Sequence, residues 1–142
     1  MKIAVSRLTA LICLLLAGEA GAACTVSATG VDFGAYDVFV ATPLDSTGTV
    51  TVTCDQAPPV DITIAIGPSG TSGGFIPRML RNVSSQDRLN YNLFTNAGRS
   101  TVWGDGAAGT STVFLKNVKK NRPEVTTIYG RIPPGHDVSQ GL

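Results

Sequence analysis

The stretch Thr49-Val50-Thr51-Val52-Thr53-Cys54 decides the fold of this 142-residue chain. Valines and a cysteine occupy every second position, and threonines occupy the positions between them. Successive side chains of a β-strand point to opposite faces of a sheet, so this alternation places apolar groups on one face and hydroxyls on the other. Valine and threonine also fit the pleated backbone well. The stretch therefore predicts a strand with one buried face.

The same period of two recurs along the rest of the chain. It predicts strands over residues 60–66, 89–95 and 125–132. No window of a dozen residues has the capped apolar stripe of an α-helix. Further strands are predicted at Cys24–Ser27 with a continuation near Val31–Phe33, at Thr112–Val118, and as a short piece at Met79–Leu80.

Segments rich in glycine and proline separate these strands. Examples are Ala57-Pro58-Pro59, Gly104-Asp105-Gly106 and Pro133-Pro134-Gly135. Short strands at this spacing, without helices between them, predict an all-β protein built as a β-sandwich.

The N-terminus has the pattern of a secretory signal peptide over residues 1–22. Lys2 and Arg7 give a positive start, an apolar run follows, and small residues close the segment. The pattern predicts cleavage after Ala22, with cleavage after Ala23 as the alternative. Because Cys24 would then be the first residue, a lipid-anchored N-terminus is a third reading. The apolar run is too short for a permanent membrane span.

Export changes the cysteine count. Cys13 lies in the predicted leader, which leaves Cys24 and Cys54 in an oxidising compartment where one pairing exists. A bridge over a loop of this length stabilises the fold by roughly 3–4 kcal/mol. The alternative is a metal site, but two distant cysteines with only His136 to assist make a poor one. We predict a Cys24–Cys54 disulfide, no metal and no cofactor.

The remaining chain, residues 23–142, carries balanced charge. Removing Lys2, Arg7 and Glu19 from the 11 basic and 10 acidic residues leaves nine of each. Such balance disfavours electrostatic binding of nucleic acid. About 120 residues suffice for one domain with one core.

Catalytic groups are scarce. His136, the single histidine, stands beside Asp137 after a Pro-Pro-Gly turn. Serines are plentiful, so the residue types alone leave a Ser-His-Asp site open. Asp105 between two glycines suits a turn cap better than a ligand or base. We expect no enzyme activity. The basic residues Lys116, Lys119, Lys120 and Arg122 suit a solvated hairpin end, with an anionic polymer as the alternative partner.

Several short motifs follow one another in a fixed order along the chain. They are Cys24-Thr25-Val26-Ser27, Val31-Asp32-Phe33-Gly34-Ala35-Tyr36-Asp37, Leu44-Asp45-Ser46-Thr47-Gly48, Val50 to Cys54, Tyr91-Asn92-Leu93-Phe94, Trp103-Gly104-Asp105-Gly106 and Tyr129-Gly130-Arg131-Ile132-Pro133. In this order they resemble the spore coat protein U domain family, whose members include subunits of archaic chaperone–usher pili. The resemblance covers nearly all of residues 23–142.

This resemblance implies an incomplete, immunoglobulin-like, pilin-like sandwich that lacks at least one strand. A periplasmic chaperone, and then a neighbouring subunit delivered through an outer-membrane usher, would supply that strand. The resemblance also implies the Cys24–Cys54 bridge. Location would be the cell surface, reached through the periplasm.

Two departures from the family pattern shape the expectation. Cys24 follows the leader directly, whereas shaft subunits carry a donor segment there, so we expect a subunit that only accepts a strand. Relatives continue beyond the Gly141 region with another alternating strand, so we expect a truncated domain that lacks a second strand.

The expected function is therefore a structural or adhesive subunit of a chaperone–usher pilus. The runner-up is a secreted coat protein of the same fold. A third reading is a carbohydrate-binding module, with Trp103, Tyr91 and Tyr36 as stacking platforms or, equally, as core residues.

Overall fold

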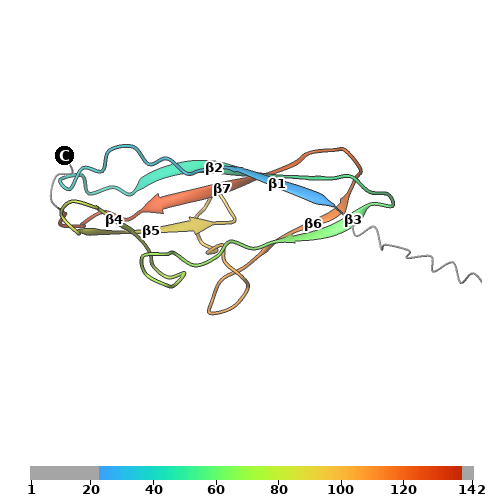
Figure 1. Cartoon of the computed structure of the whole chain (residues 1–142). Coiled ribbons are helices and arrows are strands. Elements are labelled where there is room, and N and C mark those ends of the chain that lie inside the picture. The colour runs from blue at the N-terminus through green and yellow to red at the C-terminus, as the bar shows by residue number, and fades with distance from the viewer. Residues whose placement is uncertain (1–22, 139–142) are drawn as a thin grey trace, which may run out of the picture.

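The computed structural model describes residues 23–138, and strands are the only regular elements within that range (Figure 1). Their order along the chain follows the predicted alternation closely. The strands are β1 (Cys24–Thr29), β2 (Leu44–Cys54), β3 (Val60–Ile64), β4 (Arg78–Arg81), β5 (Arg88–Phe94), β6 (Val113–Val118) and β7 (Glu124–Ile132).

The strands form two unequal antiparallel sheets. Five of them make one sheet in the order β1-β2-β7-β5-β4, and β3 pairs with β6 in the other. The larger sheet curls, so that β4 and β5 approach the level of the smaller sheet in Figure 1. The architecture is an all-β, incomplete β-sandwich, which confirms the predicted fold class.

The long strand β2 holds the larger sheet together. It pairs with β1 from Cys24↔Cys54 to Thr29↔Thr49 and with β7 from Leu44↔Ile132 to Val52↔Glu124. Directly opposite residues of such a ladder point to the same face. The inward face of the sheet therefore carries the apolar row that the opening stretch predicts.

One predicted strand segment is wrong. Residues 31–33 are extended but join no ladder, and β1 ends at Thr29. They turn inward over Gly130 of β7, where an added Cβ would lie 2.6 Å from Val31 Cγ1 and 2.7 Å from Phe33 Cζ. Val31 and Phe33 therefore pack on the glycine instead of continuing the ladder of β1. The strand predicted over residues 60–66 is also shorter and ends at Ile64.

The core lies between the two sheets. Trp103 is fully buried, and its Nε1–H donates a hydrogen bond of 3.0 Å to the Ile64 carbonyl. Full burial of a large apolar side chain contributes about 1.5–3 kcal/mol. Besides Trp103, the core cluster consists of Val50, Val52, Cys54, Ile64, Val118 and Ile128.

A buried arginine, Arg78, has no carboxylate partner within residues 23–138. Arg78 is 1% exposed; its Nη1 donates to the Gly67 carbonyl at 2.6 Å and its Nη2 to the Trp103 carbonyl at 2.8 Å. Its guanidinium lies 5.2 Å from the centre of the Phe75 ring. Desolvation lowers the pKa of Arg78 from its ordinary value. Arg78 thus ties two loop segments to β4, a role the sequence pattern does not reveal.

The disulfide joins Cys24 and Cys54 at the end of the β1–β2 ladder, where the two residues are directly opposite. We predict that the secreted protein, denatured without reduction, has no free thiol. Replacing both cysteines by serine should destabilise the fold by about 3–4 kcal/mol, because the unfolded chain regains the freedom of a 30-residue loop.

Mass spectrometry after thiol alkylation and thermal unfolding measure these two effects. Reduced protein is the labelling control. Two alkylated cysteines in the mature, unreduced sample would contradict the bridge.

A second prediction concerns acid stability. Asp45 accepts hydrogen bonds from Arg131 Nε at 2.7 Å and from Arg131 Nη2 at 2.8 Å, and Arg99 Nη1 lies 3.2 Å away. The hydrogen bond from Arg131 lowers the pKa of Asp45 below its ordinary value. This contribution is complete above the unfolded pKa of about 3.9 and is lost as the pH falls through the lower folded value.

Asp45→Asn should therefore flatten the loss of stability below about pH 4. Fluorescence of Trp103, the sole tryptophan, reports the acid transition. The matched control is Asp55→Asn, at an exposed position that takes part in no ion pair within residues 23–138. Identical acid profiles for the wild type and both variants would refute the role of Asp45.

Candidate functional site

One concavity of the described chain is a groove on the inner face of the five-stranded sheet, here called the inner-face groove. Its volume is about 550 Å³. Strand β2 gives Val50, strand β5 gives Leu93 and strand β7 gives Ile128. Residues 28–34 form one side, and Ile66, Leu80 and Tyr91 complete the lining.

The strand register explains why the lining is apolar. Leu93 is opposite Gly130, and Val50 is opposite both Ala28 and Thr126. Because opposite residues share a face, the inward row of one strand continues into the next. Inward-facing residues of β2, β5 and β7 therefore meet in the lining of the groove.

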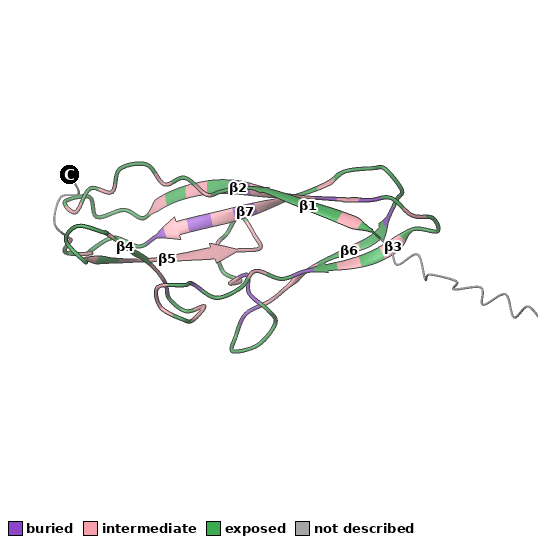
Figure 2. Cartoon of the chain, viewed as in Figure 1, coloured by how far each residue is buried: buried purple, intermediate pink, exposed green. Residues whose placement is uncertain are grey.

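Residues that should be buried are correspondingly exposed. Val26 is opposite the buried Val52, yet it is 66% exposed. Leu80, on the inward face of β4, is 42% exposed. In Figure 2 strand β1 is largely exposed, whereas β7 carries buried positions. The inward apolar face is thus incompletely covered toward both edges of the larger sheet.

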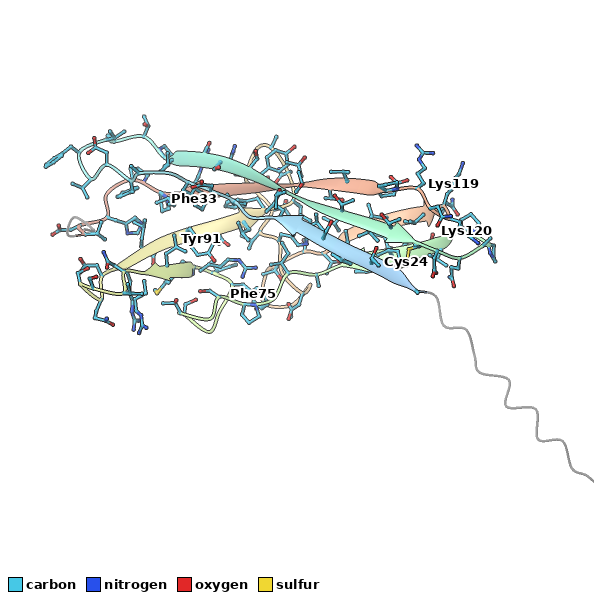
Figure 3. The ribbon with its side chains drawn as sticks, turned by 45° about the horizontal axis from the view of Figure 1, so that its top comes forward. Cys24, Phe33, Phe75, Tyr91, Lys119 and Lys120 are labelled. Atoms are coloured by element: carbon cyan, nitrogen blue, oxygen red, sulfur yellow. A yellow bond between two sulfur atoms is a disulfide. The ribbon has the colours of Figure 1, made fainter. Side chains whose placement is uncertain are left out.

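Residues 30–34 provide one wall of the groove. The Phe33 and Tyr91 rings meet edge to face with their centres 6.1 Å apart (Figure 3). The Ser46 hydroxyl donates to the Asp32 carbonyl and holds this segment against β2. Gly34 ends the wall with φ of +65°, a backbone conformation that favours glycine. Sequence reasoning missed this wall; the signal was Gly130, a glycine inside a strand pattern.

A free strand edge borders the same region. Strand β1 is the terminal strand of its sheet and pairs only with β2 among the described residues. Such an edge presents unpaired backbone N–H and C=O groups. An apolar groove beside an unpaired edge has the two features that an added β-strand requires.

The predicted catalytic candidates do not assemble into a site. His136 donates its backbone N–H to the Tyr36 hydroxyl at 3.1 Å, and the two rings meet edge to face at 6.0 Å. Within residues 23–138 its side chain makes no hydrogen bond to a serine or an acid, and Nε2 is buried without a partner. Asp105 Oδ1 instead accepts from the Ala107 N–H at 2.9 Å, as predicted for a turn cap.

Of the three aromatic candidates for sugar stacking, one is a core residue. Trp103 is 0% exposed, so its reading as a platform is wrong. Tyr36 donates its hydroxyl to the Pro133 carbonyl at 3.3 Å, and Tyr91 lines the inner-face groove. Tyr36 and Tyr91 are half-buried, and each of their rings meets another ring edge to face.

Of the predicted basic residues, Lys116 lies in β6, and Lys119, Lys120 and Arg122 lie in the connection from β6 to β7. Lys116, Lys119, Lys120 and Arg122 are all exposed, and Lys119 and Lys120 are at the end of the molecule that carries Cys24 (Figure 3). Arg122 Nε is 3.6 Å from Glu124 Oε1. The four side chains are solvated, as predicted, but β6 and β7 lie in different sheets, so the segment that joins them is not a hairpin.

Residues 23–138 contain neither a candidate metal site nor a candidate membrane-spanning helix. No group of three or more His, Cys, Asp or Glu side chains is placed to hold a metal ion in that range. Nor does that range contain a helix of the length and hydropathy needed to cross a membrane. The predicted leader and its cleavage after Ala22 lie outside the described residues.

Comparison with known proteins agrees with the motifs and the fold. The model of the Spore Coat Protein U domain matches residues 10–142. Protein U of Myxococcus xanthus is 32% identical over 133 residues, which cover 85% of this chain and 72% of the relative. The chain therefore belongs to the spore coat protein U domain family, as its ordered motifs predicted.

Proposed function

We propose that this protein is an exported structural subunit of a bacterial surface assembly, and that its inner-face groove accepts a β-strand from another chain. The observation that carries the proposal is the mismatch between a five-stranded sheet and the two strands that face it in the described chain. An inserted strand with alternating apolar side chains would pack on Leu80, Tyr91 and Leu93, which are only partly buried, and would pair with a free edge.

The energetics support strand addition. Burying four or five apolar side chains contributes on the order of 6–12 kcal/mol before ordering costs. Stability of a whole small domain is about 5–15 kcal/mol. The donated strand would therefore decide whether the domain persists as a monomer. The disulfide cannot replace it, since a cross-link restrains the unfolded chain and leaves the groove open.

Export is part of the proposal. Residues 1–22 would act as the signal peptide, with cleavage after Ala22, and residues 23–142 would form the working domain. The Cys24–Cys54 bridge is compatible with an oxidising compartment. A periplasmic chaperone, an outer-membrane usher and neighbouring subunits are the proposed partners, and the final location is the cell surface.

A secreted coat protein of the same fold is the second candidate. The family's own description as a spore coat domain supports it. The two candidates differ in whether copies exchange strands along a fibre or gather as a layer. The effect of an added strand that fills the groove distinguishes the two candidates.

We predict that residues 23–142 alone aggregate or melt at low temperature. The same protein extended by an alternating apolar strand should melt at least about 10 °C higher, since 1 kcal/mol shifts the melting temperature by roughly 2–8 °C in domains of this size. The measurement is calorimetry with light scattering. A Thr/Ser strand of equal length is the matched control.

One groove variant sharpens this test. Leu80→Asp, at the partly exposed groove margin, should reduce the gain from the apolar strand more than it destabilises the unextended protein. A monomer that melts cooperatively without the strand, and gains nothing from it, would rule out strand acceptance and favour the coat candidate.

We also propose that the protein catalyses no reaction. His136→Ala and His136→Asn should leave export and surface display unchanged, as measured by immunoblotting of surface fractions. Ester and glycoside substrates screen for hydrolysis. Turnover that both variants abolish would show that the proposal is wrong.

A further inference from the structure

One loop presents a large aromatic side chain to solvent. Residues 35–43, here called the tip loop, lie at the end of the molecule where the described chain terminates (Figure 1). Phe39 in this loop is 93% exposed, and the neighbouring Val40 is 45% exposed. A phenylalanine this exposed leaves almost its whole apolar surface in water.

The turn that carries Phe39 is held in place. The Phe39 N–H donates to Asp37 Oδ1 at 2.9 Å, and the Val40 N–H donates to the Asp37 carbonyl at 3.3 Å. A ring on a fixed turn loses little freedom when it binds. The tip loop is therefore built as a preorganised apolar knob.

An apolar hollow lies on the outward face of the larger sheet, on the side opposite the inner-face groove. This outer-face hollow has a volume of about 230 Å³. The register places Asn92 opposite Arg131 and Phe94 opposite Tyr129, alternating with the inward pair Leu93 and Gly130. Phe94, Pro77 and Pro133 supply apolar surface, and Asn90, Asn92 and Arg131 surround it.

The rim of the hollow carries positive charge and hydrogen-bonding groups that are not fully used within the described chain. Two guanidinium groups, those of Arg131 and Arg99, share the one carboxylate of Asp45, which leaves an excess positive charge. The side chain of Asn90 makes no hydrogen bond within residues 23–138 and can serve an incoming backbone.

The charge of the tip loop complements this rim. No lysine or arginine occurs between residues 8 and 77, so the loop and its surroundings in sequence carry only acidic charge. Asp37 stands two positions before Phe39. Docking of the tip loop would therefore bring a carboxylate toward the Arg131–Arg99 pair, and complementary charge favours a specific orientation.

We propose that Phe39 of one copy inserts into the outer-face hollow of a second copy of this chain. Its exposure shows that Phe39 does not occupy the hollow of its own molecule. Knob and hollow occur on one chain, so each copy has both halves of the contact. An apolar residue that fits a pocket elsewhere on the same molecule forms a contact that can repeat from copy to copy.

This contact is independent of strand addition. The hollow is on the outer face, whereas the proposed strand would enter the inner-face groove, although Tyr91 borders both. Copies already joined through the groove could make the contact side by side. Failure of one proposal leaves the other intact.

A photo-crosslinking amino acid at position 39 tests the proposal in the full-length chain, exported and assembled by its own cells. The matched control is the same substitution at Val83, which is 82% exposed on another hydrogen-bonded turn. Position 39 should give a dimer band about tenfold stronger than position 83, as expected of an anchor residue in a pocket. Mass spectrometry should place the crosslink within residues 76–94 or 131–133 of the second copy.

Two variants then test the knob and the hollow separately. Phe39→Asp removes the knob and keeps the hollow, whereas Asn92→Trp fills the hollow and keeps the knob. The crosslinker at position 39 in the Asn92→Trp chain should give no dimer alone and should give one when the Phe39→Asp chain is co-expressed. Equal secretion of all chains confirms folding.

Three results would overturn the proposal. One is a crosslink from position 39 mainly to lipid or to a different protein. Another is equal crosslinking from positions 39 and 83. The third is a failure of the mixed variants to crosslink although both chains are secreted.

Discussion

The inward row of β2 imposes the constraint on which the rest of the structure depends. Val50, Val52 and Cys54 share one face of the sheet, and all three are buried. Burial at these positions requires a second layer, because a sheet with an apolar face is stable only when that face is covered. The small β3–β6 sheet, with Trp103, supplies that layer over one part of the row.

Elsewhere the chain covers the same face by other means. Val31 and Phe33 pack over Gly130, where a side chain on the strand would collide with them. The buried guanidinium of Arg78 donates hydrogen bonds to two backbone carbonyls and lies over the Phe75 ring. These solutions leave the inner-face groove open, and its apolar lining is the physical basis of the proposed strand acceptance.

The two faces of the larger sheet therefore differ in their chemistry and in the partners that they suit. Its inward face is apolar and incompletely covered, which suits extended backbone from another chain. Its outward face is mainly threonine and paired charge around Asp45, interrupted by one apolar hollow near Phe94. A subunit with distinct binding features on two faces can be linked to neighbours in two directions.

Much of this protein could be predicted from residue order. Alternation in Thr49–Cys54 predicted the central strand, and cysteine counting predicted the Cys24–Cys54 pair that the structure joins. Ordered motifs predicted the family. These predictions succeeded because a period of two and a single available pairing are local properties, which depend little on distant residues.

Only the tertiary structure decided which part of the inward face of the larger sheet stayed uncovered. Residues 31–33 have strand propensity but pack inward at Gly130, and Trp103 has the chemistry of a binding platform but lies in the core. The buried place of Arg78 and the exposure of Phe39 were equally invisible in the sequence pattern. Each outcome depends on what surrounds a residue across the sheet, and burial free energy at such contacts exceeds the local preferences that sequence can report.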